Sequence, residues 1–176
     1  MMVLVGGMIP SSFLIPTLTS PPTIISLHST WQVPSLLLCA LVCGPRSGVI
    51  ASVAYITIGL FYLPVFHGGG NLDYLLSPSF GFLAGFIPAV WITARFTKHT
   101  HAKDLIGLTL SAIAGLACIH FFGILYLIFG SILGLWTEAL TELLYSFSLA
   151  PLPAQLAICP AVGILSLILR RLLLIK

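Results

Sequence analysis

The most informative absence in this sequence is charge. Only 6% of its 176 residues are Asp, Glu, Lys or Arg, whereas ordinary soluble domains carry about 25%. Hydrophobic residues make up 59% of the chain, and the mean hydropathy is +1.14. A soluble surface cannot be assembled from so few charged side chains. We therefore expect an integral membrane protein.

The sequence also lacks the side-chain arrangements on which intramembrane catalysis and metal binding depend. It contains neither an HExxH nor a GxSxG motif, and its histidines do not pair with carboxylates at ligand spacing within a predicted span. All four cysteines lie inside apolar runs, which argues against disulfide bonds and a zinc site. Glu138 and Glu142 share a helix face, either as a catalytic carboxylate pair or, more commonly, as the hydrated side of an amphipathic helix. We expect no enzymatic activity, no cofactor and no metal.

What the sequence has in abundance is apolar runs of helical length. A helix crosses the hydrocarbon layer with about 20 residues, so the chain has room for about six spans in a single domain, residues 1–176. The predicted runs cover residues 1–18, 33–43, 47–63, 80–96, 105–135 and 153–169. Residues 44–46, Gly-Pro-Arg, are expected to join the second and third runs as a tight helical hairpin. The predicted fold is an all-α membrane protein, a compact bundle of six transmembrane helices.

Two segments of this bundle have less regular patterns. No basic region precedes the apolar run at residues 1–18, so we interpret it as the first span and not as a signal peptide, although Pro10 and Pro16 would kink it. Residues 19–30 are expected to form a loop. Residues 136–149 repeat apolar side chains at helical spacing, which indicates either an interfacial amphipathic helix or an extension of the last span.

The positions of the basic residues predict how the bundle is oriented. With about six spans, all seven would lie on one side of the membrane: Arg46, Arg95, Lys98, Lys103, Arg170, Arg171 and Lys176. The positive-inside rule makes that side, and both termini, cytoplasmic. The segment of residues 62–86 and the carboxylates Asp73, Glu138 and Glu142 then face outside. The net charge of +3 is explained by topology and gives no reason to expect a nucleic acid partner.

The external segment of residues 62–86 is the main candidate for a binding site. Gly68, Gly69 and Gly70 permit tight backbone whose exposed N–H groups can hold an anion without a basic side chain. Asn71 adds an amide that both donates and accepts hydrogen bonds, and several aromatic residues supply apolar walls: Phe66, Tyr74, Phe80 and Phe82. The alternative is an external loop without a ligand. His120, in the middle of the fifth run, is expected to hydrogen-bond to another helix or to contact a ligand.

These motifs resemble the BioY proteins, the biotin-binding S components of energy-coupling factor (ECF) vitamin transporters. The run from Thr30 and Gln32 to the Gly-Pro-Arg of residues 44–46 is similar to the family's second span. LPVF at residues 63–66, with the glycines after it, is similar to the family's LPVF-plus-glycine loop. SPSFGFLAGF at residues 77–86 resembles the family's GPTGGYLxGF. The resemblance covers roughly Thr30 to Phe96, with weaker matches at residues 115–129 and 151–171.

The last span departs from the common family pattern. Many members have a Pro-Gly-Asp segment there, with a lysine three residues after the Asp, whereas this chain has Pro153, Ala154 and Gln155, and Ile158 at the lysine position. The Gln155 amide is still able to hydrogen-bond a ureido ring, but no cation remains to pair with a carboxylate. Residues 145–157 resemble one subgroup of the family, which would make Gln155 a feature of that subgroup.

The resemblance implies a protein of the bacterial plasma membrane that captures biotin from outside. It would deliver the vitamin through an ATP-driven complex with a transmembrane coupling subunit and two ATPase subunits, because the chain itself has no GxxxxGK[ST] loop. It implies substrate contacts from Gln32, Gly69, Gly70, Asn71, Tyr74, Ser77, Ser79, Phe82 and Gln155. Gly7 and Ser11 are the candidates for contact with the coupling subunit, and the alternative is ordinary packing within the bundle.

Three other functions remain open at this point. The chain is alternatively an S component for another small vitamin, a secondary transporter that works alone, or a membrane scaffold that binds no ligand. Few carboxylates are available inside the predicted spans to couple transport to protons, which argues against a secondary transporter that works alone.

Overall fold

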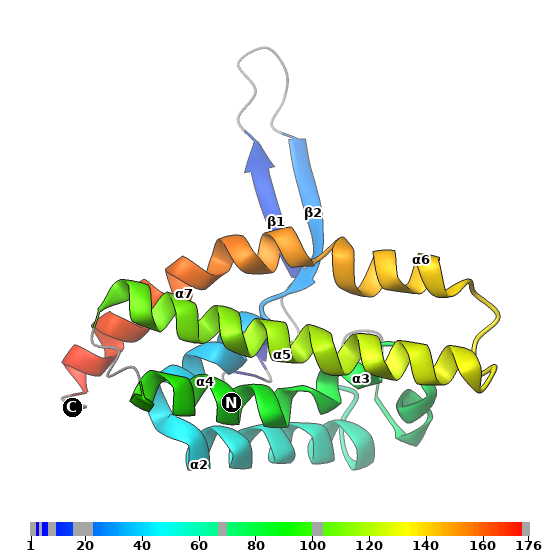
Figure 1. Cartoon of the computed structure of the whole chain (residues 1–176), viewed down its shortest axis with the longest axis horizontal. Helices are drawn as coiled ribbons and strands as arrows, with labels where there is room; N and C mark the ends of the chain where they lie inside the picture. Colours follow the sequence, from blue (N-terminus) through cyan, green and yellow to red (C-terminus); the bar gives the residue numbers. More distant parts are fainter. Residues whose placement is uncertain are drawn as a thin grey trace.

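The computed structural model describes residues 3, 5–6, 10–15, 23–66, 70–99 and 104–173. In these ranges the chain forms a bundle of helices with a short antiparallel strand pair near its start (Figure 1). Four stretches are long and apolar enough to cross a membrane: Gln32–Phe61, Phe80–His99, Leu105–Ile132 and Leu140–Leu172. This agrees with a helical membrane protein, as the composition predicted.

The first of these stretches, helix α2 (Gln32–Phe61), is two antiparallel helical segments joined at Gly44. Gly44 has φ 81° and ψ −179°, a conformation that only glycine adopts readily. The segments then lie side by side, because a Cβ on Gly48 would be 3.6 Å from the Cα of Ala40. The Nε2 of Gln32 likewise donates a hydrogen bond of 2.9 Å to the Oη of Tyr55 across the pair. The helical hairpin predicted at residues 44–46 is confirmed.

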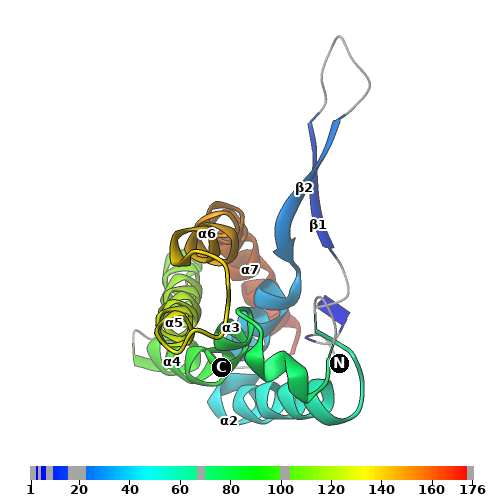
Figure 2. The ribbon, with the colours of Figure 1, turned by 90° about the vertical axis from the view of Figure 1, so that its right-hand side faces the viewer.

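The other helices pack around α5 (Leu105–Ile132), which contacts α3 (Phe80–Ala84), α4 (Phe86–His99) and α7 (Leu152–Leu172). Small residues allow this close approach, since a Cβ on Gly115 would lie 1.9 Å from the Thr93 hydroxyl and one on Gly163 would lie 2.7 Å from that of Thr109. The remaining helical elements are η1 (Leu72–Leu76), α6 (Leu140–Leu144) and the π-helical turn η2 (Tyr145–Leu149). Figure 2 shows α5 between α4 and the α6–α7 pair.

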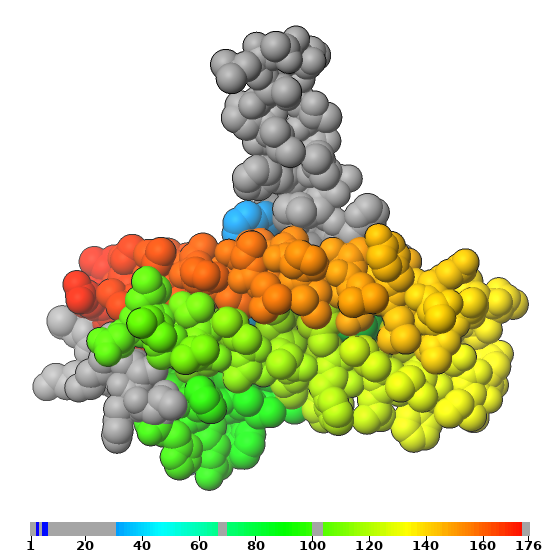
Figure 3. All heavy atoms as spheres, turned by 45° about the horizontal axis from the view of Figure 1, so that its top comes forward, coloured from blue at the N-terminus to red at the C-terminus, as the bar shows by residue number. Residues whose placement is uncertain are grey.

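Helices α6 and α7 form one continuous band along α5 (Figure 3). Residues 140–172 therefore count as a single candidate span, with η2 as an irregular turn inside it. For residues 140–149 the structure favours an extension of the last span, whereas residues 136–139 are not helical. The helix face that Glu138 and Glu142 were expected to share is therefore not present. The predicted runs at residues 105–135 and 153–169 correspond to α5 and α7 within a few residues at each end.

The beginning of the chain differs from the prediction. Residues 10–15 form strand β1 (Pro10–Ile15), which pairs antiparallel with β2 (Thr23–Thr30), with Pro10 opposite Thr30 and Ile15 opposite Thr23. The expectation of a helical first span at residues 1–18 is wrong for residues 10–15, and that of a loop at residues 19–30 is wrong for residues 23–30. The physical reasons are the missing N–H of Pro10 and the β-branched residues of β2, which favour extended backbone. The strand pair projects from the helices, and β2 contacts α7 (Figures 1 and 2).

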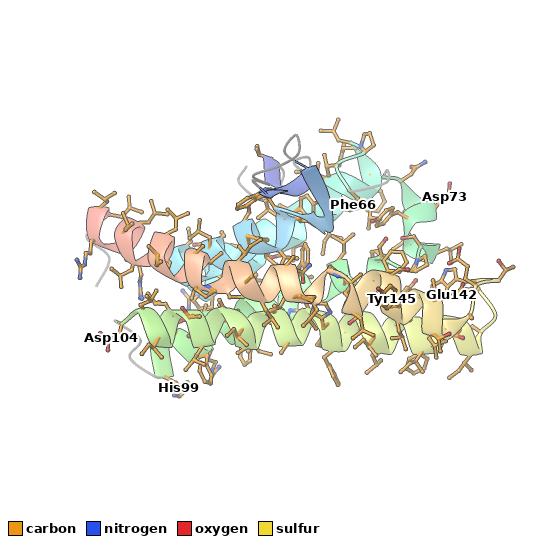
Figure 4. All side chains as sticks on the ribbon, turned by 90° about the horizontal axis from the view of Figure 1, so that it is seen from above. Phe66, Asp73, His99, Asp104, Glu142 and Tyr145 are labelled. Atoms are coloured by element: carbon orange, nitrogen blue, oxygen red, sulfur yellow. The ribbon has the colours of Figure 1, made fainter. Side chains whose placement is uncertain are left out.

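The two ends of the bundle differ in the charges that they carry. Asp73 and Glu142 lie at one end, and His99 at the other, together with Asp104 (Figure 4). The Gly44 turn lies at the His99 end, because Pro45 lines a cavity with His99 and Cys43 lines another with the last residues of α7. The segments that carry Arg46, Arg95, Lys98 and Arg170 therefore meet at one end, as the predicted topology requires.

Candidate functional site

The segment after α2 is held in a defined shape by backbone contacts. The N–H of Asn71 donates a 3.1 Å hydrogen bond to the carbonyl of Gly59, and Asn71 has φ 110°, which is unusual outside glycine. A Cβ on Gly70 would lie 2.5 Å from the Cα of Pro64 and 2.8 Å from the Gly59 carbonyl, so this position admits glycine alone. A cavity of about 260 Å³ lies between residues 59–64 and residues 70–71.

Three predicted site residues form one hydroxyl cluster beside this segment. Ser79 donates a 2.8 Å hydrogen bond to the Tyr74 hydroxyl, and Ser77 donates one of 2.8 Å to the Tyr74 carbonyl. The Ser77 and Ser79 hydroxyls are 3.0 Å apart. Burial raises the pKa of the Tyr74 phenol, while its hydrogen bonds with Ser79 and Ser77 act in the opposite direction. The phenol is therefore neutral at physiological pH, and the cluster offers hydroxyl groups to a ligand.

Gln32, a predicted site residue far from this cluster in sequence, reaches the same region through Tyr55. Gln32 is buried and donates to the Tyr55 hydroxyl, which in turn donates to the carbonyl of Val65 at 3.1 Å. The Tyr55 ring meets the buried ring of Phe66 edge-on at 5.4 Å, and Phe66 lies 4.8 Å from the ring of Tyr74. A continuous aromatic path thus connects Gln32 to the hydroxyl cluster.

A second polar cluster forms around His120 in α5. Its Nε2 lies 3.0 Å from the Oε1 of Gln155 in α7, and its Nδ1 lies 3.0 Å from the hydroxyl of Ser148 in η2. Because Oε1 only accepts, the imidazole proton is on Nε2 and Ser148 donates to Nδ1. The expected hydrogen bond between His120 and another helix is confirmed. The Nε2 amide of Gln155 has no hydrogen-bond partner within the described ranges.

Aromatic rings cover this second cluster. The ring of Phe82 meets His120 edge-on at 5.8 Å and stacks with Phe147 at 6.5 Å. Phe82 lies close to the hydroxyl cluster as well, because its N–H donates to the carbonyl of Ser79 at 3.2 Å. The start of α3 therefore carries Ser79 toward one cluster and Phe82 toward the other.

The structure places most, but not all, of the predicted site residues. It brings Gln32, Gly70, Asn71, Tyr74, Ser77 and Ser79 to the end of α2 and the start of α3, and it brings both Phe82 and Gln155 to His120. Gly69 and Gly7 lie outside the described residues. Ser11 lies on β1, so the helical face that it was expected to share with Gly7 is not present at this position.

Sequence reasoning missed several residues that shape this region. Tyr55, Phe147 and Ser148 were not predicted, although Tyr55 is a hydroxyl inside an apolar run and was detectable as such. Tyr126 donates to the carbonyl of Leu75, and the indole of Trp136 donates to that of Leu76 at 2.7 Å. These long-range contacts anchor η1, and no pattern in the sequence predicts them.

A larger cavity lies elsewhere in the bundle. It has a volume of about 600 Å³ and lies among α2, Val3 and the end of α7, where Cys39, Cys43 and Leu169 contribute to its walls. Its one hydroxyl, that of Tyr55, already donates to Val65. Because a polar ligand needs several hydrogen-bond partners, the clusters around Tyr74 and His120 are the better candidates for a binding site.

Comparison with a solved structure supports the fold. The crystal structure of the S component for biotin from an ECF-type ABC transporter matches 96% of this chain and 85% of its own, with a TM-score of 0.72 and 24% identity. At this level of identity the match establishes a shared fold.

Curated relatives include two that are named as biotin transporters. The probable biotin transporter BioY of Lysinibacillus sphaericus is 33% identical over 56% of this chain and 50% of its own length. The biotin transporter BioY of Rhizobium etli is 31% identical over 58% of this chain and 59% of its own length. An uncharacterized 21.2 kDa protein of Cyanophora paradoxa is 29% identical over 86% of this chain and 78% of its own. The family model described as the BioY family matches residues 1–174, and this chain therefore belongs to the BioY family.

Proposed function

We propose that this chain is a membrane-embedded S component that binds biotin for uptake. Membership of the BioY family, the two relatives named as biotin transporters and the fold of a biotin S component all support this function. The observation that carries it is the His120 cluster. Polar groups within an apolar helix bundle are costly and usually serve a function. In this cluster His120, which the ring of Phe82 meets edge-on, fixes Gln155 by a hydrogen bond and leaves one amide edge unengaged by any described residue.

The proposed binding mode follows from the two clusters. Gln155 and Asn71 contact the ureido ring, whose N–H and C=O groups require partners that both donate and accept. Tyr74 and Phe82 cover the thioether ring and the aliphatic chain. Ser77, Ser79 and the backbone N–H groups at Gly69 and Gly70 accommodate the carboxylate, with no basic residue involved. Gln32 completes the site from α2, where Tyr55 orients it.

A titration of purified protein with biotin tests this site. Asn71→Ala and Gln155→Ala are each expected to weaken binding by about 5- to 100-fold, because a buried hydrogen-bonding group left without its partner costs about 1–3 kcal/mol. Glu138→Gln, an exposed change outside the site, serves as the control and is expected to bind as the parent does. Parent-like affinity in both Asn71→Ala and Gln155→Ala would refute the site.

A competition experiment separates biotin from other vitamins. Unlabelled biotin is expected to displace labelled biotin, whereas riboflavin and thiamine are not. Mass spectrometry of the ligand that co-purifies with the protein gives an independent result, and recovery of another vitamin would favour the alternative S component.

The proposal extends to a transport complex in the bacterial plasma membrane. The chain contains no phosphate-binding GxxxxGK[ST] loop, so ATP hydrolysis would come from two ATPase subunits that act through a transmembrane coupling subunit. Within the described ranges no carboxylate is buried, which leaves little chemistry for proton coupling by the chain alone. High-affinity uptake is expected to require co-expression of these partners and to stop when their ATPase sites are inactivated. Uptake by the chain alone that collapses with an ionophore would favour the secondary transporter.

Contact with the coupling subunit is assigned to Gly7 and Ser11. Glycine and serine are small residues, and such residues permit close helix packing. Replacing both with leucine is expected to reduce co-purification of the coupling subunit while biotin binding is retained.

A further inference from the structure

A basic pocket lies at the end of the bundle opposite Asp73 and Glu142. Its volume is about 330 Å³, and its walls are Pro45, Trp91, Arg95, Lys98 and His99. No carboxylate is among these described lining residues, so none of them neutralises the charges of Arg95 and Lys98. Figure 4 shows His99 at this end and Asp73 far from it. The pocket is therefore separate from the proposed biotin site.

The geometry of α4 builds one wall of this pocket. Trp91, Arg95 and Lys98 follow one another at intervals of four and three residues, so they lie on the same helix face. The guanidinium carbon of Arg95 lies 4.8 Å from the centre of the Trp91 ring, a cation–π contact that restricts the guanidinium. The basic groups therefore converge on the pocket and are not spread around the helix.

The turn of α2 supplies the opposite wall. The left-handed conformation of Gly44 places Pro45 at the start of the second helical segment, next to α4. Gly48 lets this segment approach α4 closely, since a Cβ there would lie 2.3 Å from the side chain of Val90. The pocket is consequently framed by two packed helices and does not depend on a loop.

Two ordinary explanations of the basic residues do not account for the pocket. Cations are favourable in the last turn of a helix. This explains Lys98 and His99, which lie in the last turn of α4, but not Arg95, which lies one turn earlier. The positive-inside rule explains the sign of the charge at this end but not its convergence around a cavity with an exposed tryptophan. Guanidinium and ammonium groups that converge without a carboxylate are suited to phosphate.

We propose that this pocket binds the phosphate of an anionic phospholipid headgroup. Arg95 and Lys98 hold the phosphate, and His99 lies at the rim. Trp91, of which 48% is exposed, lies at the boundary between headgroup and acyl chains, a depth at which tryptophan is enriched. Basic pockets between membrane helices are known to favour such headgroups. The lipid is preferred to a soluble phosphate compound because the pocket is at the end of a candidate span, where the headgroups are.

Native mass spectrometry of the detergent-solubilised protein tests this proposal. The protein is mixed with equal amounts of phosphatidylglycerol and phosphatidylcholine, and the ratio of bound lipids is measured. The parent is expected to retain phosphatidylglycerol at least about fivefold over phosphatidylcholine, because the basic groups of the pocket favour the lipid with a net negative charge. In the double variant Arg95→Gln/Lys98→Gln the ratio is expected to fall to about one.

Arg171→Gln is the matched control, because it removes a cation near the end of α7 that does not line the pocket. It is expected to keep the parent ratio. The double variant retains five other basic residues at the predicted cytoplasmic side, so its orientation should be unchanged. Biotin binding equal to that of the parent verifies that it is folded.

Three results would overturn the proposal. The first is an unchanged lipid ratio in the double variant, and the second is an equal loss in Arg171→Gln, which would indicate diffuse charge. The third is displacement of phosphatidylglycerol by an equal concentration of soluble glycerol phosphate, which would show that the pocket binds free phosphate compounds and has no preference for lipid.

Discussion

Gly70 shows how one missing Cβ shapes the candidate site. The backbone of Pro64 and the carbonyls of Gly59 and Leu63 lie within 3.0 Å of the place where that atom would be. Backbone cannot move aside as a flexible side chain does, so the turn and the Asn71 hydrogen bond to Gly59 depend on glycine here. A sequence of three glycines suggests a flexible backbone. The structure shows that at least Gly70 is needed because the surrounding backbone leaves no room for a Cβ.

Gly70→Ala is expected to lower the unfolding free energy by about 1–3 kcal/mol, because the added carbon overpacks against backbone. It should also weaken biotin binding by displacing Asn71. Gly134→Ala is the comparison for backbone strain without contact, since Gly134 has a positive φ of 66°, unlike Gly70, and has nothing within 4 Å of its would-be Cβ. Thermal unfolding and biotin titration measure the two effects, and parent-like stability of Gly70→Ala would contradict the packing argument.

Tyr74 predicts a dependence of stability on alkaline pH. An exposed tyrosine loses its proton near pH 10, whereas burial raises the pKa of Tyr74, so above about pH 10 the native state binds more protons than the unfolded state. The free energy of unfolding therefore keeps its full value below that pH and falls as the pH rises further. Tyr74→Phe should lose less stability between pH 9 and pH 11 than the parent. Parallel pH profiles of the melting temperature would show that Tyr74 does not contribute.

At the scale of elements, the turn at Gly44 decides how α2 is used. A straight helix of this length would place Gln32 far from Tyr55, but the turn folds the two segments together and allows the hydrogen bond between them. The same turn presents Pro45 to α4 and Cys43 to α7. One backbone conformation thereby connects the proposed biotin site, the basic pocket and the apolar cavity.

Gly44→Ala is expected to destabilise the protein by about 1–3 kcal/mol, the cost of a strained backbone conformation at a residue other than glycine. No atom lies within 4 Å of the added Cβ, so steric contact does not contribute. Thermal unfolding in detergent measures the loss. A melting temperature equal to that of the parent would mean that the turn tolerates a side chain and that the hairpin is held by packing alone.

At the scale of the whole molecule, charge is divided between the two ends of the bundle. The segments with the basic residues meet at the end that holds His99, and Asp73 and Glu142 lie at the other (Figure 4). This division agrees with the predicted orientation, in which the basic end is cytoplasmic and the candidate site opens to the outside.

Cysteine labelling of intact cells tests this orientation. In a variant without the four native cysteines, Glu138→Cys is expected to react with a membrane-impermeant maleimide in intact cells. Lys98→Cys should react only after the cells are opened. Both side chains are exposed, so access depends on the side of the membrane. The reverse labelling pattern would show that the site opens to the cytoplasm.

Much of the helical architecture was predictable because it depends on local chemistry. The apolar runs mark the helices, and Gly44 and Pro45 mark the turn of α2, since these residues act on their own backbone. The family resemblance at residues 63–66 and 77–86 also depends on order along the chain alone. The error at β1 came from the same source: an apolar run is compatible with either a helix or a strand, and Pro10 weakens the helix.

The sequence by itself determined that this is a membrane protein of helices, because composition and apolar run length decide which solvent a chain can tolerate. It also determined family membership and the loop that carries Asn71 and Ser79. Only the tertiary structure decided that His120 meets Ser148, 28 residues away, and Gln155, 35 residues away. Helical periodicity states which face a side chain is on but not which side chain it meets, and that choice is made by the packing of whole helices.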